Sequence, residues 1–580
     1  MAHDSALIAT IAIGLSAAFV VGFGARRLGL PPIVGYLLAG VLIGPFTPGL
    51  IADAEIATEL AEIGVILLMF GVGLHFSVRD LLAVRRVAIP GAIVQSTVST
   101  LLGIALALAL GWGLAAGIVL GLAVSVASTV VLLRALGQRG ALESVHGRVA
   151  VGWLIVEDIF TVLVLVLLPT LPLLLGTEAG DLGSSLGALG AAVGKAAILA
   201  LLVFVIGTRA VPWVLFQVAR DGSREMFTLS VLAVALGIAF ASYAVFGVSL
   251  ALGAFLAGAI VGETDLSHRV AADALPLRDA FSVLFFVSVG MLLDPAVLIA
   301  NPLTVLGVVL LVVIGKSIAA VAIVAALGYP LRTGLTVGAG LAQIGEFSFI
   351  LATAGVAERL LPIEAFQLVV AGALVTITLN PLMFALVDPL DAWIRRHPRL
   401  RELLDRGAAD LATRGPRREP LRGHAIVVGY GRIGRTVARA LEGRNFPYLV
   451  LEEDRRAVEN LRARGVEALY GDVTDDGLLE HAGVAAARVL VLTTADPPGT
   501  AFAAKHARAA NPRIEVVARV ESGEEASRLR NIGHVQAVEG EREVGVQLAR
   551  YTLRRFGVAA NEVEIIAQGL RRRSDAPASA

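Results

Sequence analysis

The sequence contains no cysteine and few charged residues. Without cysteine the chain has neither disulfides nor thiolate metal sites, and cysteine-based redox sensing within the chain is excluded. Charged residues are 17% of the 580 residues, compared with about 25% in an average soluble domain. In contrast, 56% of the residues are hydrophobic, and the mean hydropathy is +0.79. This composition predicts a membrane protein.

Charge is distributed unevenly, although the formal net charge is zero. Residues 1–390 contain only 17 of the 48 Lys and Arg residues, and the rest follow them. This asymmetry predicts an apolar N-terminal part joined to a polar C-terminal part. The expected divisions are a transmembrane domain over 1–390, a basic cytoplasmic linker over 391–422, a folded polar domain over 423–545 and a tail over 546–580.

Long apolar runs fill the N-terminal part. A hydrocarbon core about 30 Å thick needs about 20 apolar residues per helix. Thirteen runs meet this requirement, and an all-α polytopic domain of about 13 transmembrane helices is therefore expected. The runs are 5–25, 31–49, 56–75, 87–111, 113–136, 149–170, 185–207, 226–245, 248–262, 275–293, 303–328, 333–355 and 365–390.

Arginines are concentrated in alternate loops between these runs, beginning with Arg26 and Arg27. The other loops carry only Arg359, together with acids such as Asp53. Because positively charged loops stay in the cytoplasm, the pattern predicts an outside N-terminus and a cytoplasmic C-terminal domain. The positive charge follows the first run, so this run is read as a retained helix and not as a cleaved signal peptide. The expected location is the bacterial inner (cytoplasmic) membrane, with multiple passes.

A strand, a glycine-rich turn, a helix and a second strand follow one another in "HAIVVGYGRIGRTVARALEGRNFPYLVLEED". In such a unit the glycines permit a tight turn and the approach of a pyrophosphate to the helix N-terminus. Glu452 ends the second strand, where a carboxylate can bond a ribose hydroxyl, and Asp472 ends the next strand at the adenosine edge. The predicted nucleotide-binding residues are Gly429, Tyr430, Gly431, Arg432, Ile433, Gly434, Glu452 and Asp472.

Further short strands alternate with helices, so we expect a Rossmann-like α/β domain with a parallel sheet covered on both faces. Its expected ligand is a regulatory adenine nucleotide, and AMP, NAD(H) and ATP fit the fingerprint equally well. A Rossmann fold that has lost its ligand is the alternative. No separate substrate domain and no His or Lys constellation for hydride transfer is recognisable, so the chain is not expected to be an enzyme.

Glu157 and Asp158 interrupt the otherwise apolar sixth run. A charged group at the centre of a bilayer helix costs about 2.5–3.5 kcal/mol, so each acid needs a partner or a water-filled cavity. Adjacent helical positions are about 100° apart, which favours two different roles. Lys316 in the eleventh run is the expected counter-charge of Glu157, which leaves Asp158 to exchange a proton for a cation. The alternative is an ion network that only locks helices together.

The fifth and twelfth runs are predicted to be broken at membrane depth. Breaks of this kind surround cavities, where exposed peptide dipoles can face ions, although close packing through small residues is an alternative. The offset of seven between the two broken runs predicts inverted three-helix units, 4–6 and 11–13, whose broken helices cross. This arrangement is typical of a secondary transporter, and no P-loop accompanies it. The polar residues predicted to line the ion pathway are Ser125, Ser128, Thr129, Gln343 and Glu346.

Four segments resemble the second monovalent cation:proton antiporter family, particularly its Kef-type members and most closely its YbaL branch. They are "SVAST", "VEDIF", "LFFVSVGMLLDP" and "AQIGEFSFIL". The resemblance implies a homodimer that exchanges K⁺ or Na⁺ for H⁺, with Asp158 as the carboxylate that binds the transported ion. Glutathione-gated Kef proteins carry Gln-Asp where this chain has Glu157-Asp158.

The region from about 423 to 540 resembles TrkA-N, or RCK, domains, which sense nucleotides without transforming them and which dimerise. We therefore expect a K⁺/H⁺ antiporter for potassium efflux, regulated by nucleotide. A Na⁺/H⁺ antiporter of the same architecture is the alternative, and an RCK-gated cation channel is disfavoured because a TVGYG-type filter is absent. The expected partners are the lipid bilayer, the monovalent cation, the proton and a second copy bound through both domains, but no nucleic acid.

Overall fold

The computed structural model divides the chain into two compact units, a helical unit within residues 1–396 and a second unit that contains 397–580. Each is described by itself. The described residues are 2–48, 53–75, 78–139, 141–142, 144–174, isolated positions between 187 and 205, 207–246, 249–264, 266–397, 421–453, 455–474, 476–494, 497–533 and 535–572.

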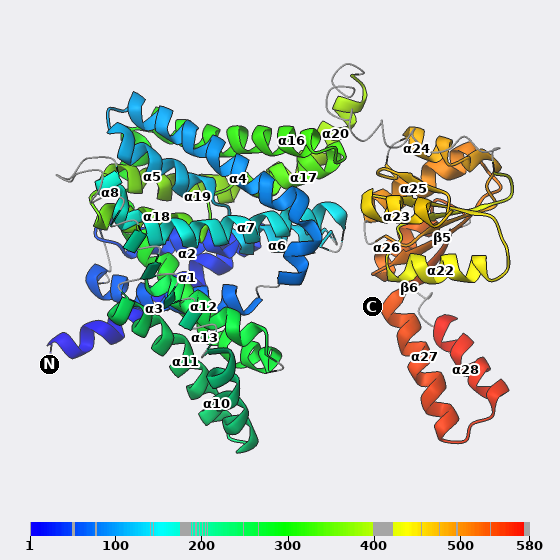
Figure 1. The fold of residues 1–580 in the computed structure, drawn as a ribbon, viewed down its shortest axis with the longest axis horizontal. Helices are drawn as coiled ribbons and strands as arrows, with labels where there is room; N and C mark the ends of the chain where they lie inside the picture. Colours follow the sequence, from blue (N-terminus) through cyan, green and yellow to red (C-terminus); the bar gives the residue numbers. More distant parts are fainter. Residues whose placement is uncertain are drawn as a thin grey trace. The chain divides into compact units, whose positions relative to one another are not determined.

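The helical unit consists of α-helices of very different lengths (Figure 1). Its first half contains α1 (Ala2–Arg27), α2 (Pro32–Ile43), α3 (Ala54–His75), α4 (Val78–Ala109), α5 (Gly113–Ser125), α6 (Thr129–Gln138), α7 (Val145–Leu167), η1 (Leu168–Thr170) and α8 (Leu171–Leu174). Its second half contains α10 (Thr208–Arg220), α11 (Arg224–Phe246), α12 (Leu250–Gly262), α13 (Ser267–Met291), α14 (Ala296–Ala300), α15 (Pro302–Leu310), η3 (Leu311–Lys316), α16 (Ser317–Ala326), α17 (Leu331–Leu341), α18 (Glu346–Ala357), α19 (Ile363–Ala385) and α20 (Val387–Arg395).

Within the described part of the chain, eight spans are long and apolar enough to cross a membrane, or nine if the bent pair α17 and α18 is one span. The helices α2 and α12 are apolar but shorter, and α13 corresponds to the tenth predicted run. The predicted run 185–207 lies mostly outside the described residues. An all-α, multi-pass membrane domain is thus confirmed, whereas the number thirteen remains a prediction. The breaks predicted in the fifth and twelfth runs are present, between α5 and α6 and between α17 and α18.

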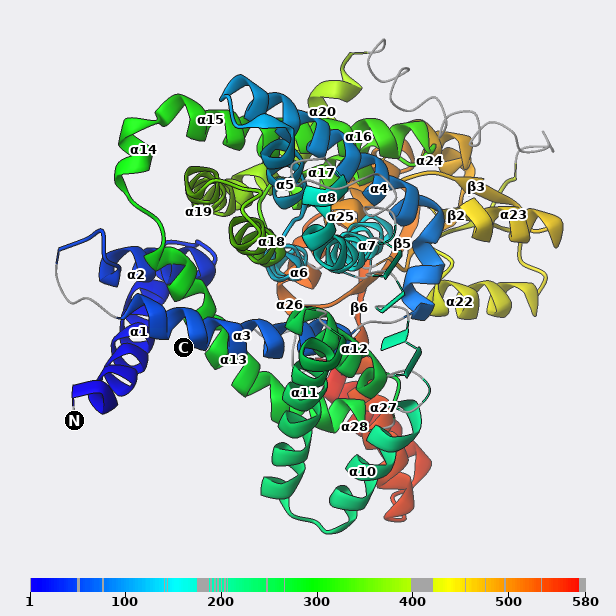
Figure 2. The same cartoon turned by 60° about the vertical axis from the view of Figure 1, so that its left-hand side comes forward.

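The helices pack in two groups (Figure 2). In the first group α13 lies against α2 and α3, α3 lies against α12, and α1 and α11 complete the group. In the second group α5 packs on α4, α18 and α19, while α15 packs on α19 and η3 packs on α4 and α5. The broken helices both belong to the second group.

Glycines allow the closest helix contacts in both groups. A Cβ atom added at Gly258 of α12 would lie 2.1 Å from the carbonyl oxygen of Phe70 on α3. One added at Gly121 of α5 would lie 2.5 Å from Cα of Thr100 on α4. In a membrane, where lipid is as apolar as leucine, helix association depends on such close backbone contact through small residues. Close backbone contact at glycines therefore contributes to the helix packing of both groups.

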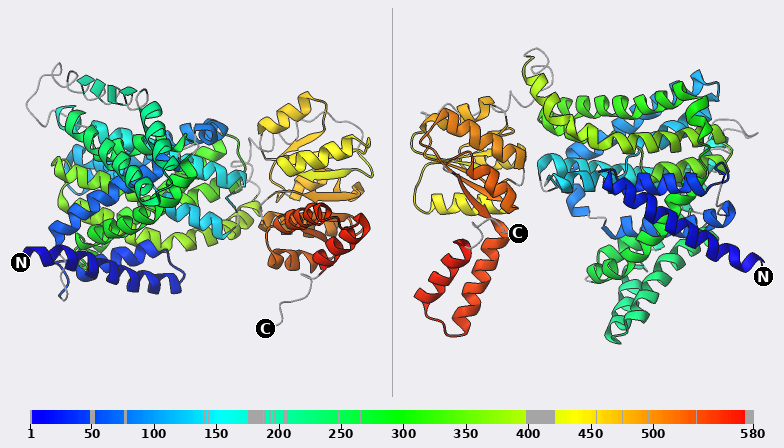
Figure 3. Two further views of the ribbon diagram at one scale, coloured as in Figure 1. Left: turned by 90° about the horizontal axis from the view of Figure 1, so that it is seen from below. Right: turned by 180° about the vertical axis from the view of Figure 1, so that it is seen from behind.

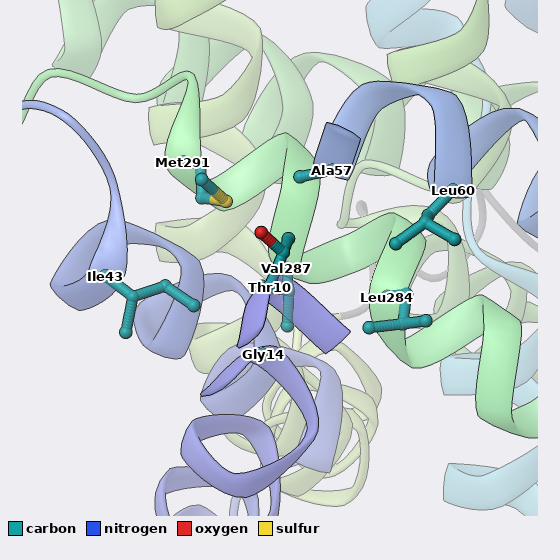
Figure 4. A pocket seen from close by; sticks show the side chains of 8 residues that line it. All are labelled: Thr10, Gly14, Ile43, Ala57, Leu60, Leu284, Val287 and Met291. Carbon is teal, nitrogen blue, oxygen red and sulfur yellow. The ribbon is translucent and has the colours of Figure 1, made fainter. Parts of the chain in front are cut away.

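A small pocket lies within the first group, among α1, α2, α3 and α13 (Figure 4). Only the hydroxyl of Thr10 among its lining side chains is polar, and this hydroxyl accepts a hydrogen bond from the backbone N–H of Asp53 at 3.2 Å. Because no ionisable side chain lines it, the pocket is not suited to exchange a cation for a proton. Its lining residues are Thr10, Gly14, Ile43, Ala57, Leu60, Leu284, Val287 and Met291.

The second unit contains a six-stranded parallel sheet with the order β3-β2-β1-β4-β5-β6. Figure 3 shows this sheet together with the helices that pack on it. Right-handed crossovers that leave β1 in opposite directions place their helices on opposite faces, so the predicted doubly covered sheet is confirmed. The strands are β1 (Ala425–Val428), β2 (Tyr448–Glu452), β3 (Ala468–Tyr470), β4 (Val489–Leu492), β5 (Glu515–Val520) and β6 (Val535–Glu539). The connecting helices are α22 (Arg432–Glu442), α23 (Arg455–Ala463), α24 (Asp476–His481), η4 (Val484–Ala486), α25 (Pro497–Ala510) and α26 (Gly523–Arg530).

A helical hairpin follows the sheet. It consists of α27 (Gly540–Arg555) and α28 (Ala560–Arg572), so the boundary expected at 545 falls inside α27 and the expected tail contains a helix. Ion pairs join the two helices, between Glu543 and Arg571 and, at 2.7 Å, between Arg550 and Glu564. The hydrogen bond from Arg571 lowers the pKa of the Glu543 carboxyl below its usual range.

Gly258 provides a test of the glycine packing. We expect Gly258→Ala to destabilise the helical unit, because the added methyl group would collide with the α3 backbone; overpacking of this kind costs about 1–3 kcal/mol. Gly237→Ala on α11 is the matched control, since nothing lies within 4 Å of the added atom. Thermal unfolding of the detergent-purified protein measures both. Equal melting temperatures for the two variants would contradict the packing role.

Candidate ion site and nucleotide site

The break between α5 and α6 leaves peptide groups without helical partners, and other helices supply them. The carbonyl oxygen of Val126 accepts from the N–H of Gly345 at 3.2 Å and from the hydroxyl of Ser348 at 3.3 Å. The N–H of Ala127 donates to Oε2 of Glu157 at 3.1 Å. The N–H of Ser128 donates to Oε1 of Gln343 at 3.0 Å. Backbone that would be intolerable in lipid is thereby satisfied inside the protein.

The break between α17 and α18, where the chain bends by 49°, is satisfied in the same way. The hydroxyl of Thr376 accepts from the N–H of Ile344 at 3.3 Å, and the side chain of Asn380 donates to the Ala339 carbonyl at 2.8 Å. The ammonium of Lys316 donates to the Gln343 carbonyl at 3.3 Å. Thr376 and Asn380, which both lie on α19, therefore bond to backbone groups at or beside this break.

The two breaks are in direct contact. A Cβ atom added at Gly345 would lie 2.6 Å from the carbonyl carbon and oxygen of Ala127, so only glycine permits this approach. The side chain of Gln343 also donates to the Ser128 carbonyl at 3.0 Å. The predicted crossing of broken helices is thus a hydrogen-bonded junction, with one segment from each half of the helical unit.

Glu157 and Lys316 stabilise opposite sides of this junction. Both side chains are fully buried and interact electrostatically with each other. Glu157 accepts from the N–H of Ala127, which has no helical partner at the first break. Lys316 donates to the carbonyl of Gln343, which has none at the second. Lys316 ends the π-helical segment η3, a local widening that is frequent at functional sites. Each charge therefore lies against backbone dipoles of the opposite sign.

Asp158 faces a different set of groups. Its Oδ2 accepts a hydrogen bond from the hydroxyl of Thr129 at 3.1 Å. Glu346, the first residue of α18, acts electrostatically on Asp158 and interacts with the side chain of Ser128. Arg278 of α13 also acts on Glu346. The two adjacent acids predicted to differ in role thus have different surroundings. Glu157 accepts from a backbone N–H and interacts electrostatically with Lys316, whereas Asp158 accepts from the hydroxyl of Thr129 and lies near a second carboxylate.

At the junction, three buried carboxylate oxygens accept no hydrogen bond from the described part of the chain. They are Oε1 of Glu157, Oδ1 of Asp158 and Oε2 of Glu346. Asp158 and Glu346 are each 3% exposed. Carboxylate and hydroxyl oxygens are suitable ligands for a partly dehydrated alkali cation. Asp158, Glu346, Ser128 and Thr129 therefore form a site that could hold such a cation or, on a carboxylate, a proton.

The structure brings seven of the eight predicted membrane-site residues to the junction. The side chain of Ser125 does not reach it, because its hydroxyl donates to the Leu122 carbonyl of its own helix. Gln95 on α4, which the sequence interpretation missed, donates instead to the Ser125 carbonyl at 3.3 Å and so completes the end of α5. The run "VQSTVST" around Gln95, polar within an apolar span, was the available signal.

The glycine loop of the second unit has the geometry expected for phosphate binding. Gly429 has a φ of +85°, and a Cβ atom at Gly434 would lie 2.0 Å from the Gly429 carbonyl oxygen. At Gly431, which precedes α22, nothing lies within 4 Å of such an atom, so the space in front of the helix N-terminus is open. Anions are favoured at this position.

The predicted polar residues border this loop. Oε2 of Glu452 accepts from the N–H of Tyr430, and the side chain of Arg435 donates to the Tyr430 carbonyl at 3.1 Å. Oδ1 of Asp472, by contrast, accepts from the N–H of Thr474 at 2.8 Å and so shapes its own loop. Arg432 and Ile433 begin α22 and are exposed.

The pair formed by Glu157 and Lys316 can be tested by removing one or both charges. We expect Lys316→Met alone to destabilise the protein by about 3–5 kcal/mol, because Glu157 would remain buried without its counter-charge. Adding Glu157→Gln should restore most of the stability, since glutamine still accepts from Ala127. Thermal unfolding of the detergent-purified variants measures this. A double variant no more stable than the single one would show that the two groups are not coupled.

Comparison with known proteins assigns the two units to families. The sodium/hydrogen exchanger transmembrane family matches residues 14–387, and the TrkA-N domain matches residues 425–539. The chain is 48% identical over 548 residues to the putative cation/proton antiporter YbaL of Escherichia coli (strain K12), covering 94% of this chain and 97% of that protein. It is 31% identical over 551 residues to the putative K(+) efflux antiporter KefB of Alkalimonas amylolytica, covering 94% and 81%.

A solved structure shares the fold of the membrane domain. The sodium proton antiporter MjNhaP1 from Methanocaldococcus jannaschii is 18% identical, covers 69% of this chain and 98% of its own, and gives a TM-score of 0.51. The crossed, broken helices and the parallel sheet agree with these family assignments. The chain therefore belongs to the sodium/hydrogen exchanger family, as a Kef-type cation/proton antiporter with a C-terminal TrkA-N domain.

Proposed function

We propose that this antiporter exchanges K⁺ for protons, with Asp158 as the carboxylate that carries them alternately. The observation that supports Asp158 is its position: it is buried, bonded to the hydroxyl of Thr129, and has one oxygen that no group in the described part of the chain contacts by a hydrogen bond. The names of two relatives, a K(+) efflux antiporter and a glutathione-regulated potassium-efflux protein, favour K⁺. Na⁺ is the alternative, in agreement with the description of the family.

Coupling follows from competition for one carboxylate. When Asp158 releases its proton, the resulting negative charge attracts a cation, for which Ser128, Thr129 and Glu346 supply further oxygens. When Asp158 binds a proton, that attraction is lost and the cation leaves. Glu157 is not expected to take part directly, because it holds the N–H of Ala127 and faces Lys316. A site that holds a proton or a cation, but not both, exchanges the two.

The C-terminal domain is proposed to lie in the cytoplasm and to regulate exchange by binding an adenine nucleotide. The open space at Gly431 suits the phosphates, and Glu452 at the end of β2 suits ribose hydroxyls. AMP, NAD(H) and ATP are all candidates. We further propose that the antiporter is a homodimer of the bacterial inner membrane with its N-terminus outside.

Asp158→Asn should reduce exchange to the level of empty liposomes, because asparagine neither releases a proton nor carries the charge that holds a cation. Purified protein in liposomes with a trapped pH-sensitive dye is given an external pulse of K⁺ or Na⁺, and the two salts rank the substrates. Asp221→Asn is the matched control, since Asp221 is exposed between α10 and α11. Undiminished flux in Asp158→Asn would remove this residue from the mechanism.

Gly431→Val should abolish nucleotide binding without unfolding the domain. The new side chain would occupy the space proposed for the phosphates, yet it would touch nothing else within 4 Å at Cβ. Titration of AMP, NADH and ATP by calorimetry on the full-length protein measures binding, with Gly545→Val on exposed α27 as the control. If Gly431→Val binds as tightly as the wild type, the nucleotide does not bind at this loop.

A further inference from the structure

Gln343 joins the two breaks through its side-chain amide. Oε1 accepts from the N–H of Ser128 at 3.0 Å, while Nε2 donates to the Ser128 carbonyl at 3.0 Å and to the Gly340 carbonyl at 3.2 Å. Gln343 is fully buried. An amide nitrogen has two hydrogens, so both donors are used. One side chain thereby satisfies both backbone groups of Ser128 and one carbonyl at the end of α17.

Gln343 bonds to the backbone of Ser128, and the hydroxyls of Ser128 and of the next residue, Thr129, belong to the proposed cation site. Ser128 interacts through its side chain with Glu346, and the next residue, Thr129, donates to Asp158. We propose that Gln343 is a positioning residue that fixes Ser128 and Thr129 beside the two carboxylates, and that it is not itself a cation ligand. This inference rests on the proposed role of Asp158 and revises the place of Gln343 in the ion pathway.

The remaining junction contacts make the expected effect local. The other end of the break is held independently, because the carbonyl of Val126 accepts from Gly345 and from Ser348. Loss of the Gln343 amide would therefore leave the N–H of Ser128 without its acceptor, whereas the N–H of Leu132 would still donate to the Ser128 carbonyl at 3.2 Å and the crossing would stay in place. The titratable groups that surround the junction in the described structure are Glu157 and Asp158 of α7, Lys316 of η3, Glu346 of α18 and Arg278 of α13.

Two variants, Gln343→Leu and Gln343→Glu, keep nearly the same side-chain size and so distinguish the loss of the hydrogen bonds to Ser128 from a change in packing volume. Gln343→Leu cannot bond to Ser128 at all, so the apparent KM for the cation should rise about tenfold, the equivalent of about 1.4 kcal/mol, with a smaller loss of maximal rate. Gln343→Glu behaves differently with pH. A protonated carboxyl has one donor and one acceptor and can replace the amide toward Ser128, whereas an ionised one would face the Ser128 carbonyl with a second acceptor.

The experiment measures flux in liposomes against the concentration of K⁺ or Na⁺, whichever drives the wild type, over a range of pH. Relative to the wild type at each pH, Gln343→Glu should approach normal KM under acidic conditions and lose affinity under alkaline conditions, whereas Gln343→Leu should be impaired throughout. Gln217→Glu, at an exposed position of α10, controls for the added charge. Should Gln343→Leu fail to fold, the pH dependence of Gln343→Glu alone decides.

The two proposals fail in different ways. If Asp158→Asn abolishes exchange while both Gln343 variants keep the wild-type KM and pH profile, the positioning role is wrong and the proposed function stands. The positioning role is also wrong if maximal rate and thermal stability fall together while KM is unchanged. If Asp158→Asn retains exchange, the proposed function itself fails, and with it the assignment of Ser128 and Thr129 to the cation site.

Discussion

The crossing of two interrupted helices is the constraint on which the membrane domain depends. At the depth of a bilayer, every peptide N–H and carbonyl must find a partner within the protein. Here the chain meets that requirement by placing one break against the other. Gly345 permits the close approach, and the side chain of Gln343 bonds to both the N–H and the carbonyl of Ser128. Two further peptide groups at the breaks, the N–H of Ala127 and the carbonyl of Gln343, bond to Glu157 and Lys316. Polar side chains therefore occur in these apolar helices where they bond to peptide groups of the junction.

The same constraint separates the two adjacent acids. Glu157 lies on the side of α7 that faces the first break and Lys316, whereas Asp158 lies about 100° around the helix and meets Thr129. A carboxylate that accepts from a backbone N–H and interacts electrostatically with a buried ammonium is poorly placed to release and rebind ions. Asp158 instead accepts from the hydroxyl of Thr129 and lies near the carboxylate of Glu346. The difference in role that we propose for the two acids agrees with this helical geometry, because adjacent positions cannot both face the first break.

The sequence was informative where a residue type conflicts with its surroundings. Acids and a lysine in apolar runs, and Ser or Gly clusters within them, located the junction because each is costly in lipid without a specific reason. The glycine fingerprint located the loop between β1 and α22, because the backbone of that loop requires glycine, as the φ of Gly429 shows. The partners of the breaks were not predictable in this way. Gln95, Thr376 and Asn380 contact them only through tertiary packing, and a single polar residue in a helix does not reveal which neighbour it faces.

The pattern of hydrogen bonds also limits how access to the site can alternate. Moving α5 and α6 relative to α17 and α18 would break the bonds between Val126 and Gly345 and between Ser128 and Gln343, and would leave those groups unpaired at membrane depth. The contact between the two helix groups has no such bonds at its aromatic part, where Phe285 of α13 lies 6.4 Å from Phe349 of α18 between ring centres. Apolar surfaces can slide with little change in free energy, whereas a satisfied polar junction cannot. For the proposed exchange, the hydrogen bonds therefore favour a movement in which the junction stays one body, with Asp158 and the hydroxyls of Ser128 and Thr129 kept together, relative to the group of α1–α3 and α11–α13.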